Sequence, residues 1–312
     1  MRKYLQIAAC LMAMGLPIQP AQAAYPDHLV RIVIPFSAGS LADILARVLI
    51  DKLTPIWKQS IIVENRPGIA GTAAAASSAP DGYTLLIAAN GHTIVKLINP
   101  SAPFDPVGDF TGVTKLISMP MILLVPPDGK HGTLKSLIDH AREAPGKLSF
   151  ASPGPSSTSY IAAAVFNKAS KLDTVHVPYK GPADAQTSIM RGDTDYYFSP
   201  AALSDDLIKS DKVRAVAATG THRIASLPNV PTFAEAGMPE FEYDAWIGML
   251  APAGTPKAIL DKISTDVAKA MAEPDVRERL AKQGAVVATS TPDQFTATLR
   301  NDMATFSKAL KK

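Results

Sequence analysis

Small and hydroxyl-bearing side chains gather in two loops of this 312-residue chain, and each loop precedes a predicted helix. The first loop runs from Pro35 to Ser40, between a predicted strand over residues 29–34 and a helical apolar spacing that begins at Leu41. Ser40 can cap that helix, and Asp43 can return the hydrogen bond as in a capping box. Free N–H groups at a helix start favour an anion. The loop is therefore a candidate ligand site, although the same unit also occurs as plain scaffold.

The second loop repeats this arrangement near the middle of the chain. Residues 148–151 predict a strand, and residues 152–159 consist only of Ser, Pro, Gly and Thr. Apolar residues at Ile161, Ala164 and Val165 have helical spacing and predict a helix that starts within this loop. A second helix N-terminus is therefore expected beside a hydroxyl-rich loop.

Other polar and aromatic residues are weaker candidates. His92 follows a predicted strand over residues 83–89, in one loop with Asn90. It could line a cleft, or it could bond to its own backbone. Tyr179 could line a cleft as well, but aromatic residues at strand ends also serve in packing. Asp43 is expected to act as a helix cap rather than as a ligand contact.

Catalytic and cofactor motifs are missing from the sequence. It has no G-x-S-x-G nucleophile elbow, although a Ser–His pair formed by distant residues stays open because such sites are defined by geometry. It has no H-E-x-x-H, paired Cys or EF-hand spacing that would indicate a metal, and no dinucleotide or P-loop fingerprint. We therefore expect no metal, no cofactor and no enzyme activity.

The N-terminus has the pattern of a secretory signal peptide over residues 1–23. Arg2 and Lys3 precede an apolar run, and Ala21 and Ala23 fit a small-x-small cleavage site, so cleavage is expected after Ala23. The remaining chain would hold 29 basic and 28 acidic residues, and it would lack cysteine because Cys10 is the only one. This near-neutral charge gives no reason to expect nucleic acid as a partner. No later stretch is long and apolar enough to span a bilayer.

Predicted strands and helices alternate along the chain in two series, which indicates an α/β fold of two lobes with a ligand cleft between them. An irregular stretch is expected from Phe104 onward, before a strand over residues 121–125. We predict that residues 24–124 and 241–312 form one lobe and that residues 125–240 form the other.

Several segments, taken in order, resemble the extracytoplasmic receptors of tripartite tricarboxylate transporters, the Bug receptors. They read IPFSAGSLADILAR, VENRPG, APDGYTLL, FDPVGDF, LSFASPG, VHVPYKG, LPNVPTFAEAGMP and WIGMLAPAGTP. Each segment alone is weakly specific, but the ordered set is specific and covers the expected mature chain. The resemblance implies a type II periplasmic binding protein with two crossover strands and a cleft that closes on a small organic carboxylate.

The resemblance also implies how the ligand is held: by backbone N–H groups and waters of the first loop, and by hydroxyls and amides of the opposite loop. Together with the candidates above, the predicted ligand-binding residues are Phe36, Ser37, Ala38, Gly39, Ser40, Asn90, His92, Gly154, Ser156, Ser157, Thr158, Ser159, Tyr179 and Ser199.

Two positions depart from the family pattern. The first loop reads Ala38-Gly39-Ser40, where relatives commonly have two adjacent glycines. Ser199 stands where many members carry an acidic residue, which can bind a ligand amino group. Its absence argues against an amino-acid ligand and favours a plain or aromatic carboxylate.

The expected function is that of a monomeric periplasmic receptor that delivers a small carboxylate to membrane permease subunits. Two alternatives remain open at this point: a receptor that presents its ligand to a membrane sensor kinase, and a periplasmic serine hydrolase.

Overall fold

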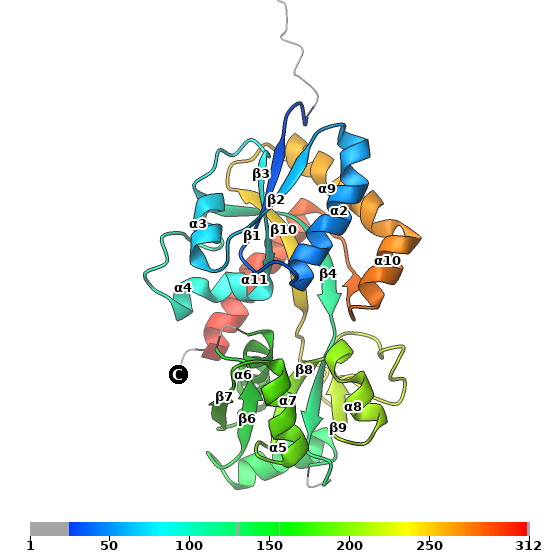
Figure 1. The fold of residues 1–312 in the computed structure, drawn as a ribbon. Coiled ribbons are helices and arrows are strands. Elements are labelled where there is room, and N and C mark those ends of the chain that lie inside the picture. Colours follow the sequence, from blue (N-terminus) through cyan, green and yellow to red (C-terminus); the bar gives the residue numbers. More distant parts are fainter. Residues whose placement is uncertain (1–24, 129–130, 156, 311–312) are drawn as a thin grey trace, which may run out of the picture.

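The computed structural model describes residues 25–128, 131–155 and 157–310, which form two lobes stacked one above the other (Figure 1). The expected signal segment and its cleavage after Ala23 lie outside the described residues, as does Ser156. Each lobe contains one β-sheet with helices on both of its faces.

The sheet of the first lobe has six strands in the order β11-β4-β10-β3-β1-β2. Strand β1 pairs in parallel with β2 and β3, whereas β10 runs antiparallel to β3 and β4, and β11 runs antiparallel to β4. The strands are β1 (Val30–Ile34), β2 (Ile61–Asn65), β3 (Thr84–Ala89), β4 (Phe110–Met119), β10 (Ala245–Pro252) and β11 (Val286–Val287).

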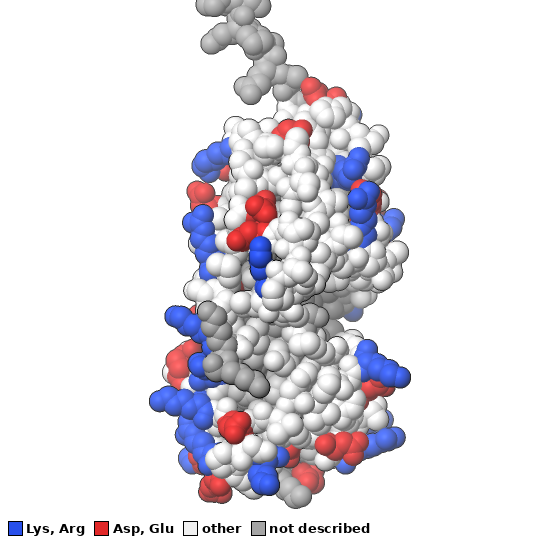
Figure 2. All heavy atoms as spheres, turned by 90° about the vertical axis from the view of Figure 1, so that its left-hand side faces the viewer, with Lys and Arg blue, Asp and Glu red and all other residues white. Residues whose placement is uncertain are grey.

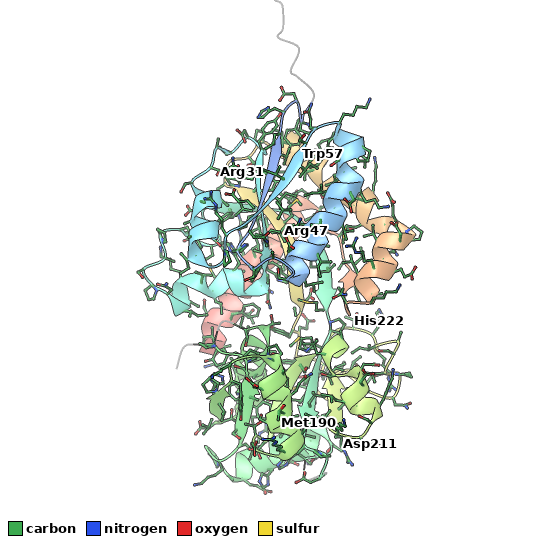
Figure 3. The ribbon with its side chains drawn as sticks, viewed as in Figure 1. Arg31, Arg47, Trp57, Met190, Asp211 and His222 are labelled. Atoms are coloured by element: carbon green, nitrogen blue, oxygen red, sulfur yellow. The ribbon has the colours of Figure 1, made fainter. Side chains whose placement is uncertain are left out.

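Two groups of helices cover this sheet. One core lies between the sheet and α2 (Leu41–Trp57), α9 (Lys257–Ala272) and α10 (Pro274–Ala281), and a second core lies under α3 (Ile69–Ala76) and α11 (Pro292–Leu310). Trp57, at the end of α2 (Figure 3), donates its indole N–H to Asp266 of α9 at 2.8 Å. A 3₁₀ turn, η1 (Asn90–Ile94), and α4 (Val95–Ile98) follow β3 toward the other lobe.

The sheet of the second lobe has five strands in the order β7-β6-β8-β5-β9. Helices α5 and α6 pack on one face of it, and α7 packs on the other. The strands are β5 (Met121–Val125), β6 (Ser149–Ser152), β7 (Val175–Pro178), β8 (Tyr196–Pro200) and β9 (Arg214–Ala218). The helices are α5 (Leu134–Glu143), α6 (Thr158–Ser170), α7 (Pro182–Arg191) and α8 (Asp205–Lys209), with a 3₁₀ turn η2 (Ala201–Leu203).

The chain crosses between the lobes at the ends of β4 and β10. Strand β4 belongs to the first sheet and β5 to the second, so the chain changes sheets at Pro120. The expected boundary after Leu124 falls inside β5, a few residues later than this change of sheet. Helix α11 makes a further link, because it packs on β4 of the first lobe and on α6 of the second.

The structure corrects the expectation of an irregular stretch after Phe104, because ten residues of that stretch form the strand β4. Gly112 and Lys115 obscure the strand pattern in the sequence. Both residues are explained by contacts with distant parts of the chain. A Cβ at Gly112 would lie 2.7 Å from the backbone nitrogen of Thr296, and Lys115 pairs with Asp244 at 2.6 Å.

The described residues contain neither a membrane-spanning helix nor a cluster of metal ligands. No described helix combines the length and the apolar character needed to cross a membrane. No group of three or more His, Cys, Asp or Glu side chains in the described part of the chain could hold a metal ion.

Candidate ligand-binding site

A cavity of about 620 Å³ lies between the lobes, where the carboxyl ends of β1 and β3 face those of β6 and β8. Ligands of open α/β sheets bind at such strand ends, and this volume is within the usual range for small-molecule sites. The described lining residues are Pro35, Phe36, Gly68, Ile69, Thr72, Ala88, Ala89, Gly91, His92, Val95, Ile98, Asn99, Phe104, Pro153, Ser157, Thr158, Ser159, Pro182, Tyr197 and Pro200.

Charged side chains do not line this cavity, since none of the described lining residues is Asp, Glu, Lys or Arg. On the face shown in Figure 2, charged side chains lie mainly over the two lobes, and the visible band between the lobes is largely free of them. Any anion in the cavity must therefore be held by uncharged donors.

The N-terminus of α6 supplies such donors from the second lobe. Ser157 caps this helix, because its hydroxyl accepts from the N–H of Tyr160 at 3.2 Å and donates to the carbonyl of Gly154 at 2.6 Å. The first turn contains no acidic residue. Ser157, Thr158 and Ser159 all line the cavity. The positive end of the helix dipole is thus directed toward the cavity with no anion of the protein beside it.

The N-terminus of α2 is already occupied by an acid of the protein. Ser40 caps the helix as predicted, since its hydroxyl accepts from the N–H of Asp43 at 3.3 Å. The second half of the predicted capping box is different: Asp43 accepts from the N–H of Gly39 at 2.9 Å, whereas the N–H of Ser40 donates to the carbonyl of Ser37 at 3.2 Å. Arg47 (Figure 3), 3.0 Å from Asp43, helps to keep the pKa of this buried carboxyl below its usual value.

Tyr197 lines the cavity and carries a buried hydroxyl. Its side chain is fully buried, and its hydroxyl makes no hydrogen bond of good geometry within the described residues, although weaker interactions with Ser159 and Ser199 oppose the rise of its pKa. Burial raises the pKa of this phenol, so it stays protonated and can donate. An unsatisfied buried hydroxyl costs about 1–3 kcal/mol. A ligand oxygen in the cavity would remove that cost.

A chain of hydrogen bonds joins the lobes beside the cavity. The side-chain amide of Asn90 donates to the hydroxyl of Tyr243 at 2.9 Å, and this hydroxyl donates to the carbonyl of Thr158 at 2.8 Å. Asn90 is fully buried and does not itself line the cavity. Its side chain therefore connects η1 of the first lobe to the N-terminus of α6.

His92 lines the cavity as a neutral group. Burial lowers its pKa to about 4, and its Nε2 lies 2.8 Å from the carbonyl oxygen of Pro106. Its ring stacks on Phe104 and contacts Phe110 edge-on. A charge on His92 is thus not available to an anion near neutral pH.

The remaining candidates are not among the described lining residues of the cavity in this conformation. Ser199 is fully buried, and its hydroxyl accepts from Ser204 at 2.7 Å. Tyr179 packs beside the core under α7. The other candidates outside the described cavity lining are Ser37, Ala38, Gly39, Ser40 and Gly154.

Several lining residues were not predicted from the sequence. Ile69 and Thr72 come from the Ala-rich helix α3, and Pro182 comes from the start of α7. Sequence rules could have identified these helix starts, because Gly68 and Gly181 precede them, but not the faces that meet the cavity. The sequence could not distinguish Tyr197 from Tyr196, because they are adjacent residues of the same type on one strand. Both are also fully buried.

A Ser–His pair exists near the second loop. The hydroxyl of Ser152 lies 2.7 Å from Nε2 of His176. The same hydroxyl accepts from the N–H of Gly154 at 3.0 Å, and Ser152 is fully buried and absent from the described cavity lining. A nucleophile must reach its substrate. This pair therefore has the geometry of a structural hydrogen bond.

We accordingly expect that a fluorophosphonate probe will not label the purified protein, because the Ser152 hydroxyl is buried. The measurement is intact-protein mass spectrometry after incubation with the probe. Labelling of wild type that is lost in Ser152→Ala would instead support a hydrolase.

The two sheet lobes and the uncharged cavity between them define a two-lobed solute-binding protein of the periplasmic type. Comparison of the chain with known protein families identifies its family. The model of the "Tripartite tricarboxylate transporter family receptor" matches residues 45–312, and the chain belongs to this family.

Relatives and solved structures agree with this assignment. Protein BugT of Bordetella pertussis is 31% identical over 287 residues, which cover 90% of this chain and 87% of that protein. The structure of R. palustris Rpa4515 with adipate has a TM-score of 0.71 and 28% sequence identity to this chain. The match covers 91% of this chain and 97% of the Rpa4515 chain. MatC of Rhodopseudomonas palustris with bound malate has a TM-score of 0.70 and 30% identity, over 92% and 100% of the two chains.

Proposed function

We propose that this receptor captures a small organic carboxylate in the cavity between its lobes and delivers it to the membrane permease subunits of a tripartite transporter. The observation that carries the proposal is the α6 N-terminus, which meets the cavity together with the unpaired hydroxyl of Tyr197. Carboxylates are the ligands named for two similar structures, adipate for Rpa4515 and malate for MatC.

The carboxylate is held by neutral donors in this proposal. One oxygen accepts from backbone N–H groups at the start of α6 and from the Tyr197 hydroxyl, and the hydroxyls of Thr158 and Ser159 stand beside it. Neutral hydrogen bonds to a charged group contribute about 1.5–3 kcal/mol each. Waters bridge the ligand to the first-lobe loop at Phe36, since water-mediated bonds can be nearly as favourable as direct ones.

Closure of the cleft completes the site. Phe36 of the first lobe is 36% exposed although it lines the cavity, so further burial is possible there. A ligand that contacts both lobes binds the closed form better than the open one and shifts the population toward it. The permease subunits then recognise the closed form. Export to the periplasm through the N-terminal signal segment, with cleavage after Ala23, is part of the same proposal.

Purified protein should bind carboxylates at one site per chain in isothermal titration calorimetry. The protein is first unfolded, freed of co-purified ligand and refolded, and the released small molecules are identified by mass spectrometry. We expect an organic carboxylate in the released fraction and saturable binding of the same compound. Folded, ligand-free protein that binds no carboxylate of a broad panel would contradict the proposed function.

A further inference from the structure

We propose that the ligand is a monocarboxylate with an apolar body, and that its carboxylate points to the second lobe while its body lies against the first. This inference rests on the proposed function and specifies the class of carboxylate. It follows from the uneven distribution of polar groups around the cavity.

The second lobe provides the polar end of the cavity. Ser157, Thr158 and Ser159 begin α6, and Tyr197 adds its buried and unpaired hydroxyl. Ser157 satisfies only the N–H of Tyr160, so the N–H groups of Thr158 and Ser159 in the first turn are left for a ligand or for water. The donors of this lobe are therefore sufficient for one carboxylate.

The first lobe provides a mainly apolar wall. Its lining side chains include Ile69, Ala88, Val95, Ile98 and Phe104. Two polar side chains of this wall are partly engaged elsewhere: Nε2 of His92 pairs with the carbonyl of Pro106, and Oδ1 of Asn99 accepts from the N–H of Ser101 at 3.2 Å and from its hydroxyl at 2.6 Å.

A second carboxylate would meet this wall without a charged partner. Burial of a carboxylate beside apolar side chains is unfavourable unless hydrogen bonds or a cation compensate it. The main uncommitted donors of the wall are Thr72, the side-chain NH2 of Asn99 and the N–H groups at the start of α3. The same wall favours a hydrocarbon chain or ring, because each apolar group that leaves water there gains free energy.

Matched ligand pairs test this inference. Hexanoate and adipate have the same chain length and differ by one terminal carboxylate, and 3-phenylpropanoate and 4-(2-carboxyethyl)benzoate form an aromatic pair. Calorimetry should give at least about tenfold tighter binding for the monocarboxylate of each pair. Tighter binding of the dicarboxylates would overturn the inference and would assign the second carboxylate to the start of α3. Binding of neither series would overturn the inference too, whereas the proposed function fails only if no carboxylate of the broad panel binds.

A substitution in the apolar wall gives a second test. Ile98 lines the cavity and is 40% exposed, so Ile98→Lys should fold normally and place a cation at the distal end of the ligand. We expect this variant to reduce the preference for hexanoate over adipate by about tenfold. Leu97→Lys is the matched control, because Leu97 is 42% exposed on the same helix but does not line this cavity, and it should keep the wild-type preference. An unchanged preference in Ile98→Lys would overturn the placement of the body against the first lobe.

Discussion

Replacing Asp302 by Asn should remove a loss of stability that the wild-type protein undergoes as the pH rises from about 4 to about 7. Asp302 lies on α11, and its carboxyl oxygen Oδ2 accepts from the indole N–H of Trp246 at 2.6 Å. Burial raises its pKa from 3.8 to about 7, and Asp244 adds to the increase, whereas the Trp246 hydrogen bond and Lys115 oppose it.

The direction of this pH dependence follows from the protonation state of Asp302 in the folded protein and in the unfolded chain. Between about pH 4 and pH 7 the unfolded chain has released the proton of Asp302, whereas the folded protein still binds it, so folding becomes less favourable as the pH rises. Asn cannot titrate, so the stability of the variant lacks this pH dependence. The difference between 3.8 and about 7 corresponds to on the order of 4 kcal/mol.

Urea unfolding of wild type and Asp302→Asn at several pH values measures the effect. Relative to wild type, the variant should gain stability steadily between pH 4 and pH 7, and wild-type Trp246 fluorescence should change with a midpoint near pH 7. Asp211→Asn is the control, because Asp211 is exposed in the second lobe (Figure 3) and Asn tolerates its φ of 55°. Parallel stability curves for wild type and Asp302→Asn would contradict a protonated Asp302 carboxyl in the folded protein.

Local patterns were sufficient to predict much of the fold. The strand β1, the loop after it and the helix α2 were predicted because a β-branched run, small residues and a capped 3.6-residue spacing follow one another there. The same patterns predicted β6 and α6. The family resemblance implied the two-lobed arrangement, which the structure and the family match confirm.

Features that depend on distant residues could not be predicted. Strand β4 contains Gly112 and Lys115, whose roles depend on α11 and on Asp244, far along the sequence. The predicted acceptor role of Asp43 was correct in kind, but its donor is the N–H of Gly39, because the turn of the loop directs the N–H of Ser40 to Ser37.

The sequence was also insufficient to predict which candidate residues line the cavity. Sequence reasoning named Ser157, Thr158 and Ser159, which line the cavity, together with Ser199, which is buried and not among the described lining residues. All four are serines or threonines near the ends of predicted elements. Only the packing of the lobes decides which of them meets the cavity.

Tyr196 and Tyr197 are adjacent on β8 and point to opposite faces of the sheet, so they offer a matched pair of substitutions. Tyr197 lines the cavity with an unpaired hydroxyl, whereas the hydroxyl of Tyr196 donates to Oδ1 of Asn167 at 2.6 Å and lies 3.0 Å from that of Thr174. Removal of each hydroxyl should therefore affect a different property of the protein.

Tyr197→Phe should weaken carboxylate binding by roughly tenfold to a hundredfold, because a hydrogen bond to a charged group contributes about 1.5–3 kcal/mol. The same variant should be at least as stable as wild type without ligand, since it removes a buried hydroxyl that has no described partner. Tyr196→Phe should lose about 1–3 kcal/mol of stability by leaving Oδ1 of Asn167 without its donor, and it should bind the ligand as wild type does. Calorimetry with the tightest-binding carboxylate and urea unfolding measure both properties. Native affinity in Tyr197→Phe would show that the ligand makes no hydrogen bond to this hydroxyl, whatever else holds it in the cavity.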